Sequence, residues 1–163
     1  MKTELERKNL SAEGLRFAVV VAGWNRRITT QLEAGAIHGL TSAGCAEDRI
    51  SVFTVPGAFE LPLACKKAAD TRKFDAVIAL GCVIRGDTPH FDFVAGEAAR
   101  GLMDVSLETG VPVIFGVITT ENLEQAIARA GGADEPENKG NEAAVTAIEM
   151  AHACREISGP IEV

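Results

Sequence analysis

The sequence has no long apolar run and no cluster of basic residues. No run reaches the roughly 18 consecutive apolar residues that would suggest a membrane helix. Residues 1–15 are polar and carry charges of both signs, so they lack the apolar centre of a secretory signal. A net charge of -7 at pH 7, without a Lys/Arg cluster, argues against nucleic acid or an anionic membrane surface as a partner. We therefore expect a cytoplasmic protein that meets any anionic ligand through local contacts.

Cysteine pairs and metal-ligand spacings are also missing. The four cysteines, Cys45, Cys65, Cys82 and Cys154, are widely and irregularly spaced, with no C-x-x-C pair and no histidine at ligand spacing. This pattern favours reduced, mostly buried thiols. The sequence predicts neither disulfides nor a metal site.

Three common fingerprints of enzymes and cofactor sites do not occur. G-x-G-x-x-G does not follow the first apolar run, G-x-x-x-x-G-K-[ST] occurs nowhere, and no Ser or Cys occupies a nucleophile elbow. These absences argue against a dinucleotide cofactor, a nucleoside triphosphate and a hydrolase-type nucleophile.

The residues that are present suit a single globular domain. The chain has 163 residues, of which 47% are hydrophobic and 24% charged, and a chain of this size can bury a substantial core. Four short apolar, β-branched runs are continuous instead of alternating, which is typical of parallel strands covered on both faces. These predicted strands are 17–21, 50–55, 76–84 and 113–118.

Helical patterns lie between and after these strands. Apolar residues recur on one helical face in two segments, at Ile28, Leu32, Ala36 and Leu40 and at Val94, Ala98, Leu102 and Val105. The sequence Gly110-Val111-Pro112 marks a helix end, and Thr120 with Glu121 predicts the cap of a helix over about 122–130. A last helix is predicted over about 139–157.

This order of elements predicts an α/β fold, with a four-stranded parallel sheet flanked by helices and right-handed crossovers. The predicted organisation is an N-terminal arm at 1–15, one α/β domain at 16–158 and a C-terminal tail at 159–163. The arm has no obvious place in the sheet, so it is either disordered or a strand given to a neighbour.

Candidate ligand-binding segments follow the strands, because open α/β sheets bind ligands beyond the carboxyl ends of their strands. They are 22–25, 56–60, 85–90 and the stretch after Phe115. Segment 86–90, Gly-Asp-Thr-Pro-His, precedes a helix, where free backbone N–H groups and the helix dipole favour an anion such as phosphate. His90 can carry a proton near neutral pH. A helix-capping turn with a solvated histidine explains the segment equally well.

The other candidate side chains also have structural alternatives. Trp24 could stack on a planar ligand or close the core, and Phe115 is typical of core packing. Glu60 could accept hydrogen bonds from ligand hydroxyls, or it could only complement the dipole at a helix start. Arg129 could bind phosphate, or it could only complement the dipole at a helix end. Lys139 at the start of a helix meets like partial charge, which favours a ligand or a partner chain. His38 and His152 are assigned to structure.

Five segments together closely resemble the lumazine synthase family. They are 55–60 (VPGAFE), 79–92 (ALGCVIRGDTPHFD), 116–120 (GVITT), 125–131 (QAIARAG) and 138–140 (NKG), in the family's order, and the similarity spans about 17–150. The resemblance implies a flavodoxin-like three-layer sandwich. It also implies condensation of 5-amino-6-(D-ribitylamino)uracil with 3,4-dihydroxy-2-butanone 4-phosphate to give 6,7-dimethyl-8-ribityllumazine, the penultimate step of riboflavin biosynthesis, with no cofactor.

The resemblance assigns roles to individual residues. Trp24 would lie against the pyrimidine, His90 would move protons, and Phe115, Arg129 and Lys139 would come from the neighbouring chain. Asp87, Thr88 and Arg129 would hold the phosphate. The remaining substrate-binding residues implied are Asn25, Ala58, Phe59, Glu60, Cys82, Val83 and Ile84, the last three mainly through backbone groups.

The resemblance also implies a ring of five subunits, with active sites between neighbours. Loop 131–138, which contains Pro136, looks longer than in family members that build closed shells. We therefore expect a homopentamer or a decamer, with riboflavin synthase as a possible further partner.

Two other functions fit parts of this pattern. A non-catalytic paralogue could use the same pocket to bind lumazine or flavin, although His90, Arg129 and Lys139 favour the enzyme. A flavodoxin-like electron carrier is a poor match, because no acidic, aromatic-flanked flavin loop is apparent.

Overall fold

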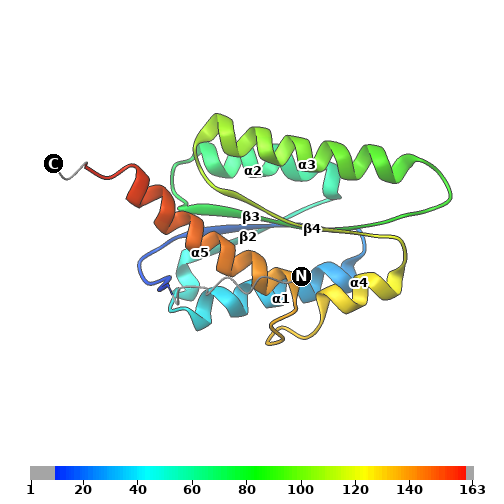
Figure 1. Cartoon of the computed structure of the whole chain (residues 1–163), viewed down its shortest axis with the longest axis horizontal. Coiled ribbons are helices and arrows are strands. Elements are labelled where there is room, and N and C mark those ends of the chain that lie inside the picture. Colours follow the sequence, from blue (N-terminus) through cyan, green and yellow to red (C-terminus); the bar gives the residue numbers. More distant parts are fainter. Residues whose placement is uncertain (1–9, 161–163) are drawn as a thin grey trace, which may run out of the picture.

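A four-stranded parallel sheet lies at the centre of the protein, between two layers of helices (Figure 1). The computed structural model describes residues 10–160. The strands are β1 (Phe17–Ala22), β2 (Ile50–Val55), β3 (Ala76–Ile84) and β4 (Val113–Thr120), in the order β2-β1-β3-β4. The predicted flavodoxin-like α/β fold is confirmed.

Five helices connect and cover these strands. They are α1 (Arg26–Ser42), α2 (Leu61–Asp70), α3 (His90–Thr109), α4 (Leu123–Ala130) and α5 (Lys139–Ile157). Helices α2 and α3 lie on one face of the sheet, and α1, α4 and α5 lie on the other (Figure 1). Two single-turn 3-10 helices, η1 (Glu47–Arg49) and η2 (Ala58–Glu60), flank β2. Glu60, the last residue of η2, occupies the N-cap position of α2, at the helix start that its place in the sequence predicted, and its side chain makes no capping hydrogen bond.

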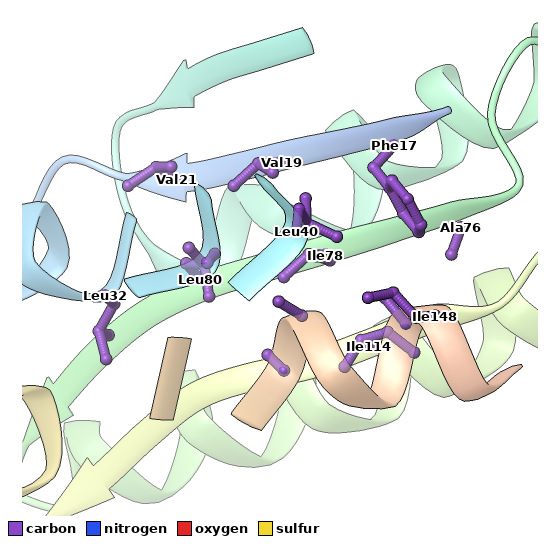
Figure 2. Packing of buried hydrophobic residues seen from close by; sticks show 14 of the residues in the cluster. Phe17, Val19, Val21, Leu32, Leu40, Ala76, Ile78, Leu80, Ile114 and Ile148 are labelled. Carbon is purple, nitrogen blue, oxygen red and sulfur yellow. The ribbon is translucent and has the colours of Figure 1, made fainter. Parts of the chain in front are cut away.

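The sheet separates two apolar cores. Along β1, Phe17, Val19 and Val21 enter the core shared with α1 and α5, while Ala18 and Val20 enter the core shared with α2 and α3. This division follows from the period of two along a strand. Figure 2 shows the first core, in which Leu32 and Leu40 of α1 and Ile148 of α5 meet the strand residues. The buried face predicted for α1 is confirmed, and so is that of α3, except that Val94 is only half-buried.

Helices α1 and α5 cross at very short range because small residues line the contact. A Cβ atom placed on Gly140 would lie 1.8 Å from the carbonyl oxygen of Leu32, and one on Gly39 would lie 2.7 Å from Cβ of Ala144. No side chain fits at Gly140 without moving backbone. The start of α5, which carries Lys139, is thereby held against α1.

Strand β2 differs from the prediction. Its continuous apolar run predicted a strand buried on both faces, but Val52 and Phe53 are exposed by 39% and 47%. The reason is that β2 is an edge strand, with β1 as its one neighbour. An apolar run predicts that a strand is shielded from water, but it does not show whether the same chain or another chain shields it.

The ends of two helices test the predicted caps. Gly110 adopts φ 70° after α3, so the predicted helix end is confirmed. The predicted cap at Thr120 is wrong, because Thr120 is the last residue of β4 and pairs with Ile84. Asn122 caps α4 instead, its side-chain oxygen accepting from the backbone N–H of Gln125 at 2.9 Å.

Part of the predicted N-terminal arm packs on the domain. Ala12 and Leu15 are fully buried in the core beneath α1 and α5, and the N–H of Ala12 donates to the carbonyl of Ala43 at 2.8 Å. Residues 1–9 of the arm and 161–163 of the tail lie outside the described residues, so the domain boundaries stay a prediction. No helix within 10–160 combines the length and apolar character needed to span a membrane.

Candidate functional site

A hollow of about 590 Å³ opens at the carboxyl ends of β1, β2 and β3, next to the start of α3. This position is where ligands bind in open α/β sheets, and the volume suits a small organic molecule. The structure brings together nine predicted site residues in its lining: Trp24, Asn25, Ala58, Phe59, Glu60, Cys82, Val83, Ile84 and His90. Gly57, from the predicted segment 56–60, also lines it, and so do Phe93 and Val94, which were missed as site residues.

Hydrogen bonds join the three strand ends that form this hollow. The N–H groups of Gly23 and Trp24 donate to the carbonyls of Val55 and Pro56 at 2.8 and 3.0 Å. The Asn25 side-chain amide donates to the carbonyl of Cys82 at 2.9 Å. Asn25 therefore braces β1 against β3, in a left-handed backbone conformation with φ 56°. The wall of the hollow is held in place before any ligand arrives.

The aromatic side of the hollow is open to solvent. Trp24 is 74% exposed, so it does not close the core. A Cβ atom on Gly57 would lie 2.9 Å from Cδ1 of Trp24 and 3.1 Å from a carboxylate oxygen of Glu60. Because Gly57 has no side chain, the indole ring of Trp24 and the carboxylate of Glu60 can both face the same part of the hollow. The arrangement can hold a flat ring and a hydroxylated chain side by side.

The exposed turn 86–89 leads directly into α3, as the sequence predicted. Pro89 occupies the N-cap of α3 and has no side-chain group that could cap the helix, which leaves room for an anion at its first turn. The backbone N–H of His90, the first residue of the helix, donates to Oγ1 of Thr88 at 3.4 Å. Asp87 and Thr88 lie in this turn, beside the hollow but outside its lining.

Arg85 lies at the base of the turn, where it contacts three side chains. Its guanidinium donates to both carboxylate oxygens of Asp92, at 3.2 and 3.4 Å, and its Nε lies 2.9 Å from Oε2 of Glu121. The guanidinium carbon is 4.2 Å from the ring centroid of Phe91. The hydrogen bonds that Arg85 donates to Asp92, and then to Glu121, raise the pKa of Arg85. Sequence analysis missed this cluster, because Glu121 belongs to a different loop.

A second hollow of about 450 Å³ runs along edge strand β4 and the start of α5. It contains the three remaining predicted residues, Phe115, Arg129 and Lys139, and it shares no lining residue with the first hollow. Phe115 is 49% exposed, which contradicts the core packing that its apolar strand suggested. The structure of one chain therefore separates the predicted site into two parts.

The two cations of the second hollow have partners in their own helices. Nζ of Lys139 contacts both carboxylate oxygens of Glu142, at 2.9 and 2.8 Å, which relieves its unfavourable position at the start of α5. Arg129 donates to the carbonyl of Gln125 at 3.0 Å, and within residues 10–160 it forms no ion pair. Arg129 is thus the cation of this hollow that is ready for an anionic ligand.

The cysteines and two histidines serve the fold. All four thiols are free, and burial raises the pKa of Cys65 to about 12 and that of Cys82 to about 11. The Cys82 thiol in the hollow is therefore neutral near pH 7 and a poor nucleophile. His38 contacts Ser42 at 3.3 Å and His152 contacts the carbonyl of Ser11 at 2.7 Å, so their assignment to structure agrees with their contacts. No group of three His, Cys, Asp or Glu side chains suited to a metal occurs in the described part of the chain.

Comparison with known proteins extends over almost the whole chain. A sequence profile of the 6,7-dimethyl-8-ribityllumazine synthase family matches residues 14–155. The chain belongs to this family. A 6,7-dimethyl-8-ribityllumazine synthase of Clostridium kluyveri is 53% identical over 148 residues, which are 91% of this chain and 95% of the relative. A family member of Chlorobium luteolum, with the same name, is 54% identical over 148 residues, 91% of this chain and 94% of the relative.

Membership of the lumazine synthase family agrees with the resemblance of the five segments. All five segments contribute residues to the two hollows, and the family match covers every strand and helix up to Arg155 in α5. The family assignment therefore applies to the part of the chain that builds both hollows.

Proposed function

We propose that this protein condenses 5-amino-6-(D-ribitylamino)uracil with 3,4-dihydroxy-2-butanone 4-phosphate to form 6,7-dimethyl-8-ribityllumazine, in riboflavin biosynthesis. The observation that carries this proposal is the hollow at the ends of β1, β2 and β3, which holds nine residues expected of a lumazine synthase site. Relatives at 53% and 54% identity bear the name of this enzyme and support the same conclusion.

The first hollow accommodates the ribitylaminouracil in this proposal. Trp24 stacks on the pyrimidine, a contact worth roughly 1 kcal/mol beyond the buried area. Backbone groups of Val83 and Ile84 orient the ring. The Glu60 carboxylate accepts hydrogen bonds from the ribityl hydroxyls, since it faces the same space as the indole. Phe59 and Ala58 exclude water from the ring.

The sugar phosphate occupies the turn before α3. Backbone N–H groups of the turn and of the first turn of α3, together with the hydroxyl of Thr88, bind the phosphate oxygens. Asp87 contributes its N–H, with its carboxylate directed away. Arg129 of a neighbouring subunit adds the positive charge that compensates the phosphate dianion as it leaves.

The chemistry needs orientation and proton transfer. The amine of the uracil attacks the ketone, water and phosphate leave, and the ring closes. His90 lies beside both the hollow and the turn, so it can move protons between the amine, the carbonyl oxygen and the leaving phosphate. Holding both reactants at one place accounts for most of the acceleration.

A ring of five subunits would unite the two hollows in each active site. Support comes from their separation within one chain and from a third, apolar hollow of about 550 Å³ beside edge strand β2. Phe53, Leu63 and Phe74 line this third hollow, and an exposed apolar surface of this kind favours a contact between subunits. We further propose a cytoplasmic pentamer or decamer, with riboflavin synthase as a candidate partner.

The proposal is tested by mixing purified protein with both substrates and following the absorbance of the lumazine product. Product formation at a rate proportional to enzyme, above the uncatalysed reaction, is expected. Tight binding of flavin or lumazine without turnover would contradict the proposal and favour a non-catalytic binder. Release of inorganic phosphate, measured in the same samples, should match the product in a ratio of one to one.

A further inference from the structure

Turn 86–89 carries the groups that we assign to the phosphate, yet few hydrogen bonds hold it in place. Among the described residues, its hydrogen bonds go only to the start of α3, from His90 to Thr88 and from Asp92 to Pro89. The turn is exposed along its whole length. A binding site built on such a turn needs a further device to hold its geometry.

Arg85 and Asp92 provide a link across the base of this turn. They lie 7 residues apart in the chain and are joined by two hydrogen bonds between the guanidinium and the carboxylate. This forked geometry restricts both ends of the turn in distance and in angle. The ring of Phe91 supports the guanidinium from one side.

Glu121 extends the link to the next loop. Its carboxylate meets Nε of Arg85, and the backbone N–H of Arg85 donates to the carbonyl of Thr120 at 2.8 Å. The turn after β3 is therefore tied to the loop after β4. With Asp92 and Glu121 engaged, three N–H groups of Arg85 are occupied by protein, so the guanidinium is poorly placed to take a phosphate itself.

We propose that Arg85 is a positioning residue for phosphate binding, acting through Asp92 and Glu121 to hold turn 86–89 and His90 in their binding geometry. This inference rests on the proposed function, because it concerns the substrate phosphate of that reaction. It differs from the role of Arg129, which contacts the phosphate.

The test compares Arg85→Lys with Arg100→Lys. Arg100 is a matched control, because it lies on the exposed side of α3 and also bridges two carboxylates, Glu97 and Asp104. In both variants, lysine keeps the positive charge but cannot form the bidentate hydrogen bonds of a guanidinium. Arg85→Lys should raise KM for the butanone phosphate about threefold or more, with KM for the ribitylaminouracil unchanged within about twofold. Arg100→Lys should change neither, and both variants should unfold at the same temperature.

A second variant separates positioning from direct binding. Asp92→Asn should raise KM for the butanone phosphate as Arg85→Lys does, and the double variant should be no worse than either single one, because the pair acts as a unit. If Arg85 bound phosphate directly, Asp92→Asn would release it and leave that KM unchanged or lower. Such a result, or equal kinetics for Arg85→Lys and Arg100→Lys, would overturn the proposal.

Calorimetric titration with inorganic phosphate gives the same comparison without turnover. Arg85→Lys should weaken phosphate binding about threefold or more, and Arg100→Lys should not. Equal phosphate affinities in the two variants would overturn the positioning role even if the protein formed no lumazine. If the unaltered protein formed no product but the two variants still differed in phosphate affinity as predicted, only the proposed function would be contradicted.

Discussion

Asn138 joins three segments, two of which carry the cations of the second hollow, and its loss should strongly destabilise the protein. The side chain is fully buried, and its amide nitrogen donates to the carbonyls of Gln31, Ala130 and Gly132. Its oxygen accepts from the N–H groups of Gly140 and Asn141, the first amides of α5. One side chain thus connects α1, the end of α4 and the start of α5.

The expected cost of Asn138→Ala follows from these contacts. Loss of the helix cap costs about 1 kcal/mol. The carbonyls of Ala130 and Gly132 lose a buried donor, at about 1 kcal/mol each, while the carbonyl of Gln31 keeps its partner within α1. The sum is about 3 kcal/mol, or an apparent melting temperature lower by roughly 6–12 °C for a chain of this size.

Thermal and urea unfolding of Asn138→Ala and of the control Asn141→Ala measure this cost. Within the described residues the side chain of Asn141 forms no hydrogen bond, so its loss should cost less than about 1 kcal/mol. A cost below about 1 kcal/mol for Asn138→Ala as well would refute the reasoning. Turnover should also fall in Asn138→Ala, because Arg129 and Lys139 directly adjoin the segments that Asn138 joins.

A third variant, Asn138→Asp, separates the contribution of the helix cap from that of the hydrogen bonds that the amide nitrogen donates. The carboxylate can still cap α5, but it cannot donate to the three carbonyls, and burial favours its neutral form. Its pKa in the folded protein is then raised above the unfolded value near 4, so stability relative to wild type should be greatest below about pH 4 and fall as the pH rises. A stability difference from wild type that did not change with pH would contradict this explanation.

Further predictions concern catalysis, stability at high pH and assembly. His90→Ala should lower kcat about tenfold or more while ribitylaminouracil still binds, and an unchanged rate across pH would remove His90 from the mechanism. Arg129→Ala should raise KM for the butanone phosphate more than KM for the uracil, and equal increases would indicate a structural role. Burial raises the pKa of Cys65 to about 12, so its contribution to stability is present below pH 9 and is lost as the pH rises toward about 12. Above about pH 9, the free energy of unfolding measured with urea should therefore fall with pH more steeply than in Cys65→Ala, by up to about 1.4 kcal/mol per pH unit. Equal pH dependence in the two proteins would disprove this. Light scattering should give a mass of five or ten chains, since the carboxylates of loop 131–138 disfavour closer packing of rings, and a species of sixty chains would contradict this prediction.

Local pattern was sufficient to predict most of the fold. The four apolar runs correspond to the four strands, and β2 and β3 have the predicted bounds. Strand β4 extends to Thr120 because the longer β3 continues to pair with it, which the composition of the run itself does not reveal. That extension moved the cap of α4 from Thr120 to Asn122.

The first hollow was predictable because the strand-end rule and the family resemblance selected the same residues. Arg85 and Asn138 were not assigned roles, although both stand in the family segments. Their partners come from loops and helices distant in sequence, such as Glu121 and Gln31, and periodicity carries no information on such contacts. The apolar strand pattern did not predict the exposure of Phe53 and Phe115, because an apolar strand looks the same whether its own chain or another chain covers it. For Phe115, the family resemblance had implied a place at a neighbouring subunit's site.

The central claim is that each active site combines the first hollow of one subunit with the second hollow of its neighbour. Rings reassembled from equal amounts of His90→Ala and Arg129→Ala chains test this claim most directly. Random mixing should restore about a quarter of the sites, because a site is intact when both contributing chains have the needed residue. Activity near a quarter of wild type, above both parents, is expected. Activity no higher than that of the parents, in particles shown by mass to contain both chains, would place both residues in one subunit's site.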